Sequence, residues 1–406
     1  MNQSFEIKEL RRFCNKKDFI EYSLSVSDLN VLLDPVCDSI IDETFEFDIK
    51  QIGSYYLSDL LDNKLILRKL NDNIKRIYKN EQANRKIIIS QLSVLLEETC
   101  PCWIIKTDIK SFYESIDRCK LIDKFKDDSM LSYYSMFLLK KLFSNKLLLT
   151  SSGLPRGMNI SATLSEIYMR KFDKWIKKHE SVFYYARFVD DIIIFSNSLQ
   201  DAQLIIENLN SKLVELAPGL TINMHKTQLF DSLTLGQLDI EKGIKLHKNN
   251  FLEYLGYKFS KINNDNKLIL SIGIAEKKIK KMKTRIMLSF LDYSKNKNFS
   301  LLNNRIRFLT GNYGIKKTSE GNTLKSGIYF NYPHLNDKNK LIELNTFFRR
   351  ILYCKNGYLG IKMSCLSMIQ RKKLTKYCFT SGFNKKIYKS FPYSKIGEIV
   401  KCWKKI

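Results

Sequence analysis

The spacing of hydrophobic and polar positions divides the chain into three regions. Residues 1 to about 100 are predicted to be mostly helical. Residues from about 100 to 262 contain short apolar runs rich in aromatic and β-branched side chains, which are typical of strands. From Lys277 a helical pattern follows, with apolar positions at helical spacing: Ile279, Met282, Ile286 and Phe290.

Two of the strand-like runs meet at a pair of adjacent aspartates, Asp190 and Asp191. The segment 183–195 reads Phe-Tyr-Tyr-Ala-Arg-Phe-Val-Asp-Asp-Ile-Ile-Ile-Phe, which predicts two strands joined by a tight turn. A third run, 103–109, carries Asp108 near its end. Adjacent carboxylates at a hairpin tip repel each other and are costly unless a cation binds them.

Three carboxylates at strand ends match the needs of a two-metal phosphoryl-transfer site. Such a site holds two Mg²⁺ ions about 4 Å apart, one activating the attacking oxygen and one steadying the leaving group. We therefore predict Asp108, Asp190 and Asp191 as metal ligands, with the backbone carbonyl of Ile109 also facing a metal. The alternative for Asp191 is that it contacts a metal-ligating side chain and does not bind the metal itself. An Asp-Asp pair can also be an ordinary surface turn, which the apolar flanks disfavour here.

Composition and charge point to a globular protein with a polyanionic partner. The 406 residues are enough for about two or three subdomains. Apolar residues make up 44% and aromatic residues 12%, which excludes a disordered chain. The formal net charge of +26, from 68 Lys and Arg against 42 Asp and Glu, favours nucleic acid as the partner. The alternative is a basic protein whose lysines are merely solvated.

The cysteines and the hydropathy bear on location. The nine cysteines are scattered, none forms a Cys-x-x-Cys pair, and the four histidines do not cluster with them. This pattern argues against a zinc site and predicts a reducing, cytoplasmic environment. We expect no signal peptide and no membrane span, because no apolar stretch reaches about 18 residues.

A glycine-bounded loop, Gly153-Leu-Pro-Arg-Gly157, lies between the aspartate-bearing runs. Its glycines allow the backbone to approach a ligand closely, so Arg156 and Gly157 are candidates for nucleotide contact. Ser161 is predicted to cap the helix that follows. Most loops of this kind are only turns, and the position between two carboxylate-bearing strands strengthens the functional interpretation.

Tyr113 and Lys226 are candidates for roles beside the aspartates. Tyr113 lies five residues after Asp108, where its ring can sit under the sugar of a nucleotide and clash with a 2′-hydroxyl. Lys226, in the run Thr221-Ile-Asn-Met-His-Lys-Thr-Gln-Leu-Phe230, can protonate the departing pyrophosphate or hold its charge. The alternatives are a core aromatic residue and a solvated lysine.

Two later segments are candidates for primer and template contact. Phe251-Leu-Glu-Tyr-Leu-Gly-Tyr-Lys-Phe259 alternates like a strand hairpin, and Tyr254, Leu255 and Gly256 are predicted to hold the primer end. An ordinary core strand is the alternative. The helix from Lys277 carries six positive residues in nine, and its exposed face is predicted to bind template through Lys277, Lys280 and Lys281.

The order of these motifs resembles the successive palm motifs of reverse transcriptases. The resemblance runs through Asp108, Gly-Leu-Pro-Arg-Gly, Phe-Val-Asp-Asp, Asn-x-x-Lys-Thr and Tyr-Leu-Gly, over roughly residues 80–262. It implies an α+β, right-hand polymerase fold with fingers, an antiparallel-sheet palm and a helical thumb. The implied domains are 1–100 (N-terminal region and fingers), 101–262 (palm with interleaved fingers elements) and 263–406 (basic thumb and C-terminal RNA-binding region).

The resemblance also implies an activity and its reactants. A member of this family synthesises DNA from dNTPs on an RNA template, with two Mg²⁺ ions or, alternatively, Mn²⁺. Asn84-Arg-Lys-Ile-Ile88 resembles the triphosphate-binding strand of the fingers, which makes Arg85 a further nucleotide-binding candidate. The chain departs from the usual pattern twice, with Phe188 in place of the common tyrosine and Arg156 at a position often held by glutamine.

Within the family, the chain resembles bacterial defence-associated enzymes of the unknown-group and abortive-infection class. Asp-Ile-Lys-Ser-Phe-Tyr-Glu-Ser-Ile, Arg305-Ile-Arg-Phe-Leu-Thr-Gly-Asn312 and Ser326-Gly-Ile-Tyr-Phe-Asn-Tyr-Pro333 carry this likeness, which is strongest to the short polymerase of type-3 systems. It implies antiphage defence and a non-coding RNA bound by the basic thumb. It also allows a second reverse transcriptase or another copy of the chain as partner.

Other functions stay open from the sequence. A retron-type reverse transcriptase primed from its own RNA is a close alternative, and template-independent or protein-primed DNA synthesis is another. A non-catalytic RNA-binding scaffold is disfavoured because all three carboxylates are present. A metal-dependent nuclease is disfavoured by the order of the five motifs.

Overall fold

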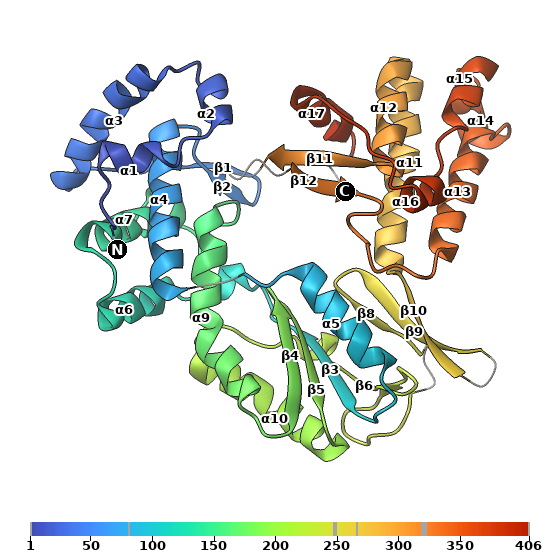
Figure 1. The fold of residues 1–406 in the computed structure, drawn as a ribbon, viewed down its shortest axis with the longest axis horizontal. Coiled ribbons are helices and arrows are strands. Elements are labelled where there is room, and N and C mark those ends of the chain that lie inside the picture. The colour runs from blue at the N-terminus through green and yellow to red at the C-terminus, as the bar shows by residue number, and fades with distance from the viewer. Residues whose placement is uncertain (1, 80–81, 247–249, 265–266, 318–322, 405–406) are drawn as a thin grey trace. The chain divides into compact units, whose positions relative to one another are not determined.

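The computed structural model describes residues 2–79, 82–246, 250–264, 267–317 and 323–404 (Figure 1). The chain forms two compact units. The first comprises Met1–Ile88, Cys100–Ser232 and Gln237–His247, and the second comprises Ile89–Thr99, Leu233–Gly236 and Lys248–Ile406. Each unit therefore combines segments that are distant in the sequence.

The amino-terminal part of the first unit is mainly helical, as predicted, and also contains a small hairpin. The helices are α1 (Ile7–Arg11), α2 (Lys16–Glu21), α3 (Val26–Ile41) and α4 (Leu61–Tyr78). The hairpin pairs β1 (Lys50–Ile52) with β2 (Tyr55–Leu57). Its strands are short and largely exposed, so they lack the apolar run that would have predicted them.

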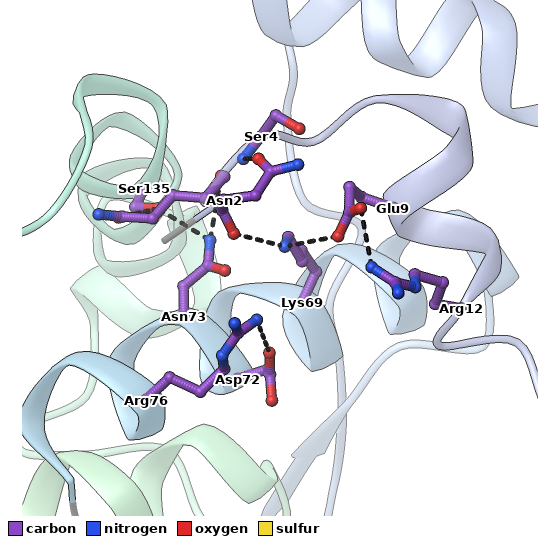
Figure 2. A network of polar contacts seen from close by, with 10 residues as sticks. Asn2, Ser4, Glu9, Arg12, Lys69, Asp72, Asn73, Arg76 and Ser135 are labelled. Carbon is purple, nitrogen blue, oxygen red and sulfur yellow. Dashed lines mark hydrogen bonds and ion pairs between the residues drawn. The ribbon is translucent and has the colours of Figure 1, made fainter.

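Helix α4 holds the first residues of the chain through a buried lysine (Figure 2). The Lys69 side chain is fully buried, and its ammonium donates to Oε2 of Glu9 at 3.3 Å and to the carbonyl of Asn2 at 3.2 Å. Asn73, one helical turn further on, donates to Oγ of Ser135 at 3.2 Å. These partners compensate the Lys69 ammonium and the Asn73 NH2 group for lost hydration, and they fasten the N-terminal segment to α4.

A five-stranded antiparallel sheet forms the centre of the first unit. Its strands lie in the order β4-β5-β3-β6-β7, and Figure 1 labels the first four of them. Their bounds are β3 (Trp103–Asp108), β4 (Val182–Phe188), β5 (Asp191–Ser196), β6 (Gln228–Asp231) and β7 (Gln237–Leu238). The isoleucines of β3 and β5 are fully buried, which suits central strands. The predicted hairpin of β4 and β5 and the predicted strand before Asp108 are confirmed.

Two long helices pack on this sheet. Helix α9 (Asn159–Lys177) contacts β4 and α4, and α10 (Leu199–Leu216) contacts β3 and β5. One face of α9 carries apolar residues at helical spacing, all buried except for the half-buried Trp175: Leu164, Ile167, Tyr168, Phe172 and Ile176. Shorter helices in this unit are α6 (Arg118–Asp128), α7 (Tyr133–Phe143) and α8 (Lys146–Leu149).

The prediction for Ser161 is wrong. Helix α9 begins at Asn159, so Ser161 already lies within its first turn and cannot be its cap. The Ser161 hydroxyl instead donates to the carbonyl of Pro155 at 2.6 Å. This bond ties the glycine-bounded loop to the helix that follows it.

The second unit combines a three-stranded sheet, a hairpin and helices. Its sheet has the order β10-β9-β8, from β8 (Leu252–Tyr254), β9 (Tyr257–Asn264) and β10 (Lys267–Ile274). The hairpin pairs β11 (Asn312–Lys317) with β12 (Thr323–Gly327). The helices are α5 (Arg85–Glu97, in this unit from Ile89), α11 (Glu276–Asn296), α12 (Phe299–Thr310), α13 (Asn339–Leu352), α14 (Gly357–Met363), α15 (Met368–Leu374), α16 (Phe379–Asn384) and α17 (Tyr393–Lys401).

The predicted boundary between residues 262 and 263 does not follow the elements of this unit. It falls inside β9, which pairs with β10 along its whole length, from Tyr257 opposite Ile274 to Asn264 opposite Lys267. The region from 263 also contains β10, β11 and β12, and is therefore not purely helical. Assignment of these segments to fingers, palm and thumb stays a prediction.

Two general features of the described residues concern sulfur chemistry and membranes. All nine cysteines carry free thiols. No helix among these residues combines the length and the apolar character that crossing a bilayer requires.

Candidate active site

The three aspartates converge at one end of the central sheet. Asp108 and Asp191 lie directly opposite each other where the antiparallel strands β3 and β5 meet. The N–H of Ile109 donates to the carbonyl of Asp190 at 3.2 Å, which joins the β4–β5 turn to the end of β3. The N–H of Asn223 donates to the carbonyl of Asp108 at 2.8 Å. Backbone pairing thus brings together the carboxylates that the sequence places 82 positions apart.

The turn that carries Asp190 is conformationally strained. Phe188 pairs with Asp191, so Val189 and Asp190 form a two-residue connection between β4 and β5. Val189 has φ +62°, a left-handed conformation that a β-branched residue rarely adopts. Such strain persists only where the surrounding structure enforces it, and it is common at functional sites.

The electrostatics of the cluster disfavour three negative charges. Burial, followed by the charge of Asp190, raises the pKa of Asp191 to about 6 from its ordinary value of 3.8. Asp108 raises it further, whereas Lys106 and Lys226 lower it without cancelling the increase. A buried carboxylate next to like charges is a marker of functional sites because a cation bound there would remove the repulsion.

Lys226 is close to Asp108, as its candidate role requires. Its Nζ is 2.5 Å from Oδ2 of Asp108, and this hydrogen bond raises the pKa of the Lys226 ammonium. The hydroxyls of Thr107 and Thr227 lie 2.7 Å apart and are both buried, which holds the lysine-bearing segment against β3. Thr107 was not predicted as a site residue, although its place directly before Asp108 is a usable signal.

The donor set suits a divalent cation. Carboxylate oxygens are the ligands that Mg²⁺ and Mn²⁺ prefer. Within the described ranges, Oδ1 of Asp108 is buried and has no hydrogen-bond partner, as a metal ligand would before metal binds. Across those same ranges, no three Asp, Glu, His or Cys side chains are already gathered closely enough to enclose an ion. The metal roles of the aspartates and of the Ile109 carbonyl stay predictions.

Tyr113 lies beside Arg156. It begins the short 3₁₀ helix Tyr113–Ser115, is half-buried, and contacts the ring of Phe112 at 5.4 Å between centroids. Burial raises the pKa of its hydroxyl. The Arg156 guanidinium lies 6.0 Å from the Tyr113 centroid and forms an ion pair with Glu114. This ion pair of Arg156 with Glu114 was not predicted from the sequence.

The two glycines of the loop approach the chain's own backbone. Gly153 has φ +69°, and a Cβ there would clash with the carbonyl oxygen of Tyr113. Gly157 has φ +97°, and a Cβ there would be 2.8 Å from the carbonyl oxygen of Tyr56. The observed need for glycine is therefore internal packing, which places Arg156 next to Tyr113. Contact of this loop with a nucleotide stays a prediction.

The strand predicted around Arg85 is wrong. Arg85 is the first residue of α5, and Oδ1 of Asn84 accepts the N–H of Lys86 at 3.0 Å, as a helix-capping residue does. The consecutive isoleucines of this segment favour a strand locally, but its buried residues recur at helical spacing: Ile88, Ile89, Leu92 and Leu96. If Arg85 contacts a triphosphate, it therefore does so from the first residue of a helix and not from a strand.

The predicted primer and template residues lie in the second unit. Tyr254 is 2% exposed and Leu255 and Gly256 form the β8–β9 turn, with φ +47° and +83°. The Tyr254 side chain thus belongs to the core, and only the turn is accessible for a primer contact. Helix α11 buries Ile279, Ile286 and Phe290, and it exposes the predicted basic residues: Lys277, Lys280 and Lys281.

Comparison with known proteins identifies the family. Residues 57–259, half of the 406-residue chain, match the family of the reverse transcriptase (RNA-dependent DNA polymerase). The chain belongs to this family, and the predicted α+β right-hand polymerase fold class is thereby confirmed. No curated protein sequence matches the chain.

Solved structures similar to the chain include yeast telomerases. Apo telomerase from Candida tropicalis, truncated from its C-terminal domain, has 14% identity and a TM-score of 0.34 over 49% of this chain. Telomerase from Candida albicans in complex with a TWJ fragment of telomeric RNA has 11% identity and a TM-score of 0.36 over 84% of this chain. The corresponding complex from Candida tropicalis has 12% identity and a TM-score of 0.35 over 92% of this chain. The chain spans 46%, 53% and 64% of these three chains respectively.

Proposed function

We propose that this protein is an RNA-directed DNA polymerase that adds dNTPs to a primer 3′-hydroxyl. The observation that carries the proposal is the pairing of Asp108 with Asp191, with Asp190 in the adjoining turn, in a chain of the reverse transcriptase family. The raised pKa of Asp191 supports a site that is completed by cations.

Asp108, Asp190 and Asp191 would hold two Mg²⁺ ions, with Mn²⁺ as the alternative. When bound, the ions would supply charge neutralisation and activation of the attacking hydroxyl. Asp108 contributes Oδ1, which has no hydrogen-bond partner among the described residues, and Oδ2 once Lys226 leaves it. The Lys226 ammonium, kept protonated beside Asp108, can then move its proton and charge to the departing pyrophosphate.

The incoming nucleotide would lie against Tyr113, Arg156 and Gly157. The Arg156 charge, now paired with exposed Glu114, is available for exchange onto a triphosphate because a surface ion pair is worth little. The half-buried Tyr113 ring beside it would exclude a 2′-hydroxyl. Arg85 at the start of α5 is a further candidate for the triphosphate.

Sugar selection by Tyr113 can be tested directly. Tyr113→Ala should raise ribonucleotide incorporation relative to dNTP incorporation by roughly 10- to 100-fold, because loss of a steric contact is worth about 1–3 kcal/mol. Tyr113→Phe is the matched control and should retain selection. Unchanged selectivity in single-nucleotide extension by Tyr113→Ala would make the ring a packing residue only.

Primer and template would be bound by the second unit. The exposed lysines Lys277, Lys280 and Lys281 of α11 and the net charge of +26 support contact with a phosphate backbone. The turn of Leu255 and Gly256 beside Tyr254 would hold the primer end. The ligands would then be a template RNA and the DNA product.

The finer biological role proposed is antiphage defence with a non-coding RNA, in the cytoplasm. The segments 305–312 and 326–333, which carry the resemblance to defence-associated enzymes, lie together because Asn312 pairs with Gly327 across β11 and β12. The N–H of Tyr329 also donates to Oδ1 of Asn312 at 2.9 Å. A second reverse transcriptase, or another copy of the chain, is the additional protein partner proposed.

The experiment is to supply the purified protein, with its co-purified nucleic acid, with Mg²⁺ and labelled dNTPs, and to sequence the product. A defined DNA product that disappears after ribonuclease treatment would support RNA-templated synthesis and identify the template. A product that survives ribonuclease would favour protein-primed or untemplated synthesis. The Asp190→Asn, Asp191→Asn double variant is the control, and normal synthesis by it would refute the proposed site.

A further inference from the structure

An arginine just before the paired aspartates is the centre of a buried ion network. Arg187 lies near the end of β4, and only 3% of its side chain is exposed. Its Nε and Nη2 donate to the two carboxylate oxygens of Asp173 at 2.9 and 2.7 Å. Its Nη1 and Nη2 donate to the two oxygens of Glu166 at 3.1 and 2.6 Å. Both carboxylates belong to α9, so the guanidinium joins β4 to that helix through two bidentate contacts.

The fifth contact of Arg187 reaches the turn. Nη1 also donates to the carbonyl of Val189 at 2.9 Å. All five N–H donors of the guanidinium are therefore engaged, four with carboxylates and one with the backbone. The two carboxylates aim the planar guanidinium at the carbonyl that immediately precedes Asp190.

Val189 needs such support because of its backbone conformation. A two-residue connection with a positive φ at its first central position normally has glycine there. Valine at φ +62° carries a steric cost that would relax if the turn were free to change. Relaxation would rotate the peptide between Val189 and Asp190 and move Asp190 away from the N–H of Ile109, which now donates to its carbonyl.

We propose that Arg187 is a positioning residue that holds the strained Val189 turn and so aims Asp190 and Asp191 at the cations they bind. This inference rests on the proposed function, since it assumes that these aspartates are metal ligands. Glu166 and Asp173 act through Arg187 by fixing its plane on α9. A buried ion network adds little to stability compared with apolar packing, so its effect here lies in geometry.

The test removes the network without leaving a buried charge unpaired. The network-free variant carries Arg187→Met, Glu166→Gln and Asp173→Asn, and a second variant adds Val189→Gly, which tolerates a positive φ without strain. Val189→Gly alone is the reference. Mn²⁺ binding to each purified protein is measured by electron paramagnetic resonance titration, with circular dichroism to confirm folding.

We expect the network-free variant to bind Mn²⁺ roughly 10- to 100-fold more weakly than the wild type, the usual cost of losing support behind a metal ligand. Adding Val189→Gly should recover most of this loss, because the turn no longer needs to be held against strain. A network-free variant with wild-type affinity would overturn the proposal. A loss that Val189→Gly does not recover would also overturn it, since the network would then act through general packing.

The same titration separates failure of this proposal from failure of the proposed function. If the wild type binds Mn²⁺ and the Asp190→Asn, Asp191→Asn control does not, the metal site stands and the variants judge Arg187 alone. If the wild type binds no Mn²⁺, the proposed function and the role of Arg187 are both contradicted.

Discussion

Two polar clusters in the first unit shift the pKa of a carboxyl group in opposite directions. Around Lys69, a fully buried ammonium meets Glu9 and the carbonyl of Asn2 (Figure 2). Burial alone would raise the pKa of Glu9, but Lys69 and Arg12 outweigh it and the pKa falls below its ordinary value. At the aspartate cluster, burial and the neighbouring carboxylates raise the pKa of Asp191 to about 6, because they outweigh the lowering effect of the nearby lysines.

The difference separates charges that are paired within the fold from charges that we propose bind a cation. In the Lys69 cluster the ionised forms of Lys69 and Glu9 stabilise each other, so these buried charges are paired within the chain. In the aspartate cluster the ionised form of Asp191 is destabilised by the folded structure itself. Such a cluster lowers the stability of the fold, and binding of a cation there would explain why the chain has it. Substitutions in the two clusters should therefore change stability in opposite directions.

The largest effect is expected at Lys69. Lys69→Met should lower the free energy of unfolding by about 3–5 kcal/mol, because it removes the buried partner of Glu9 and leaves that carboxylate with only the exposed Arg12. Urea unfolding followed by circular dichroism measures this. Arg76→Met, on the same helix, is the matched control, since Arg76 forms only a partly exposed pair with Asp72 at 3.5 Å and should cost about 1 kcal/mol or less.

DNA synthesis per folded molecule should be the same in Lys69→Met and the wild type at a temperature where both are folded. Equal losses of stability in Lys69→Met and Arg76→Met would show that the buried network is not needed for the fold. The contrast between the two clusters would then disappear.

A smaller effect of opposite sign is expected at Asp191. Its folded pKa of about 6 lies above the ordinary value of 3.8, so the stability linked to its protonated form is present below pH 3.8 and is lost as the pH rises through 6. In metal-free buffer at pH 7.5, Asp191→Asn should therefore be more stable than the wild type, by about 3 kcal/mol at most. The gain should vanish near pH 4 in the same urea experiment, and a gain independent of pH would contradict its electrostatic origin.

The smallest effect on stability is expected at Lys226. Its side chain is 65% exposed, so Lys226→Met should change the free energy of unfolding by less than about 1 kcal/mol despite the contact with Asp108. Single-turnover primer extension should nevertheless slow by roughly 100-fold, because a proton donor to the leaving group is lost. Lys106→Met, on the neighbouring strand β3, is a comparison variant. An unchanged extension rate in Lys226→Met would return this residue to the solvated surface.

The parts of the fold that were predictable from the sequence are those with local signals. The apolar runs around Asp108 and around the Asp190–Asp191 pair became β3, β4 and β5, because strands that bury residues in a core, as β3 and β5 do most fully, require such runs. The basic helix α11 buries and exposes the predicted faces because helical spacing is also local. Convergence of the carboxylates was predictable because Asp108 ends a strand, Asp191 begins one, and Asp190 lies in the turn directly before it.

The contacts that the sequence did not reveal join residues far apart in the chain. Thr107 meets Thr227, and Arg187 meets Glu166, only after the sheet and α9 have packed. The segment at Arg85 has the β-branched composition of a strand, yet tertiary burial at helical spacing made it a helix. The boundary placed after residue 262 falls inside β9, because the extent of this strand depends on pairing with β10, a partner later in the chain.

The measurement that tests the central claim most directly is urea unfolding of the wild type and Asp191→Asn at pH 7.5, each with a chelator and with excess Mn²⁺. The claim is that the aspartate cluster is unfavourable alone and is completed by cations. It predicts that the variant is the more stable protein in chelator. With Mn²⁺ at 100 times its dissociation constant, the wild type should gain about 2.7 kcal/mol and the variant clearly less, so that the gap closes or reverses. Equal gains from Mn²⁺ in both proteins, or none in the wild type, would contradict the claim.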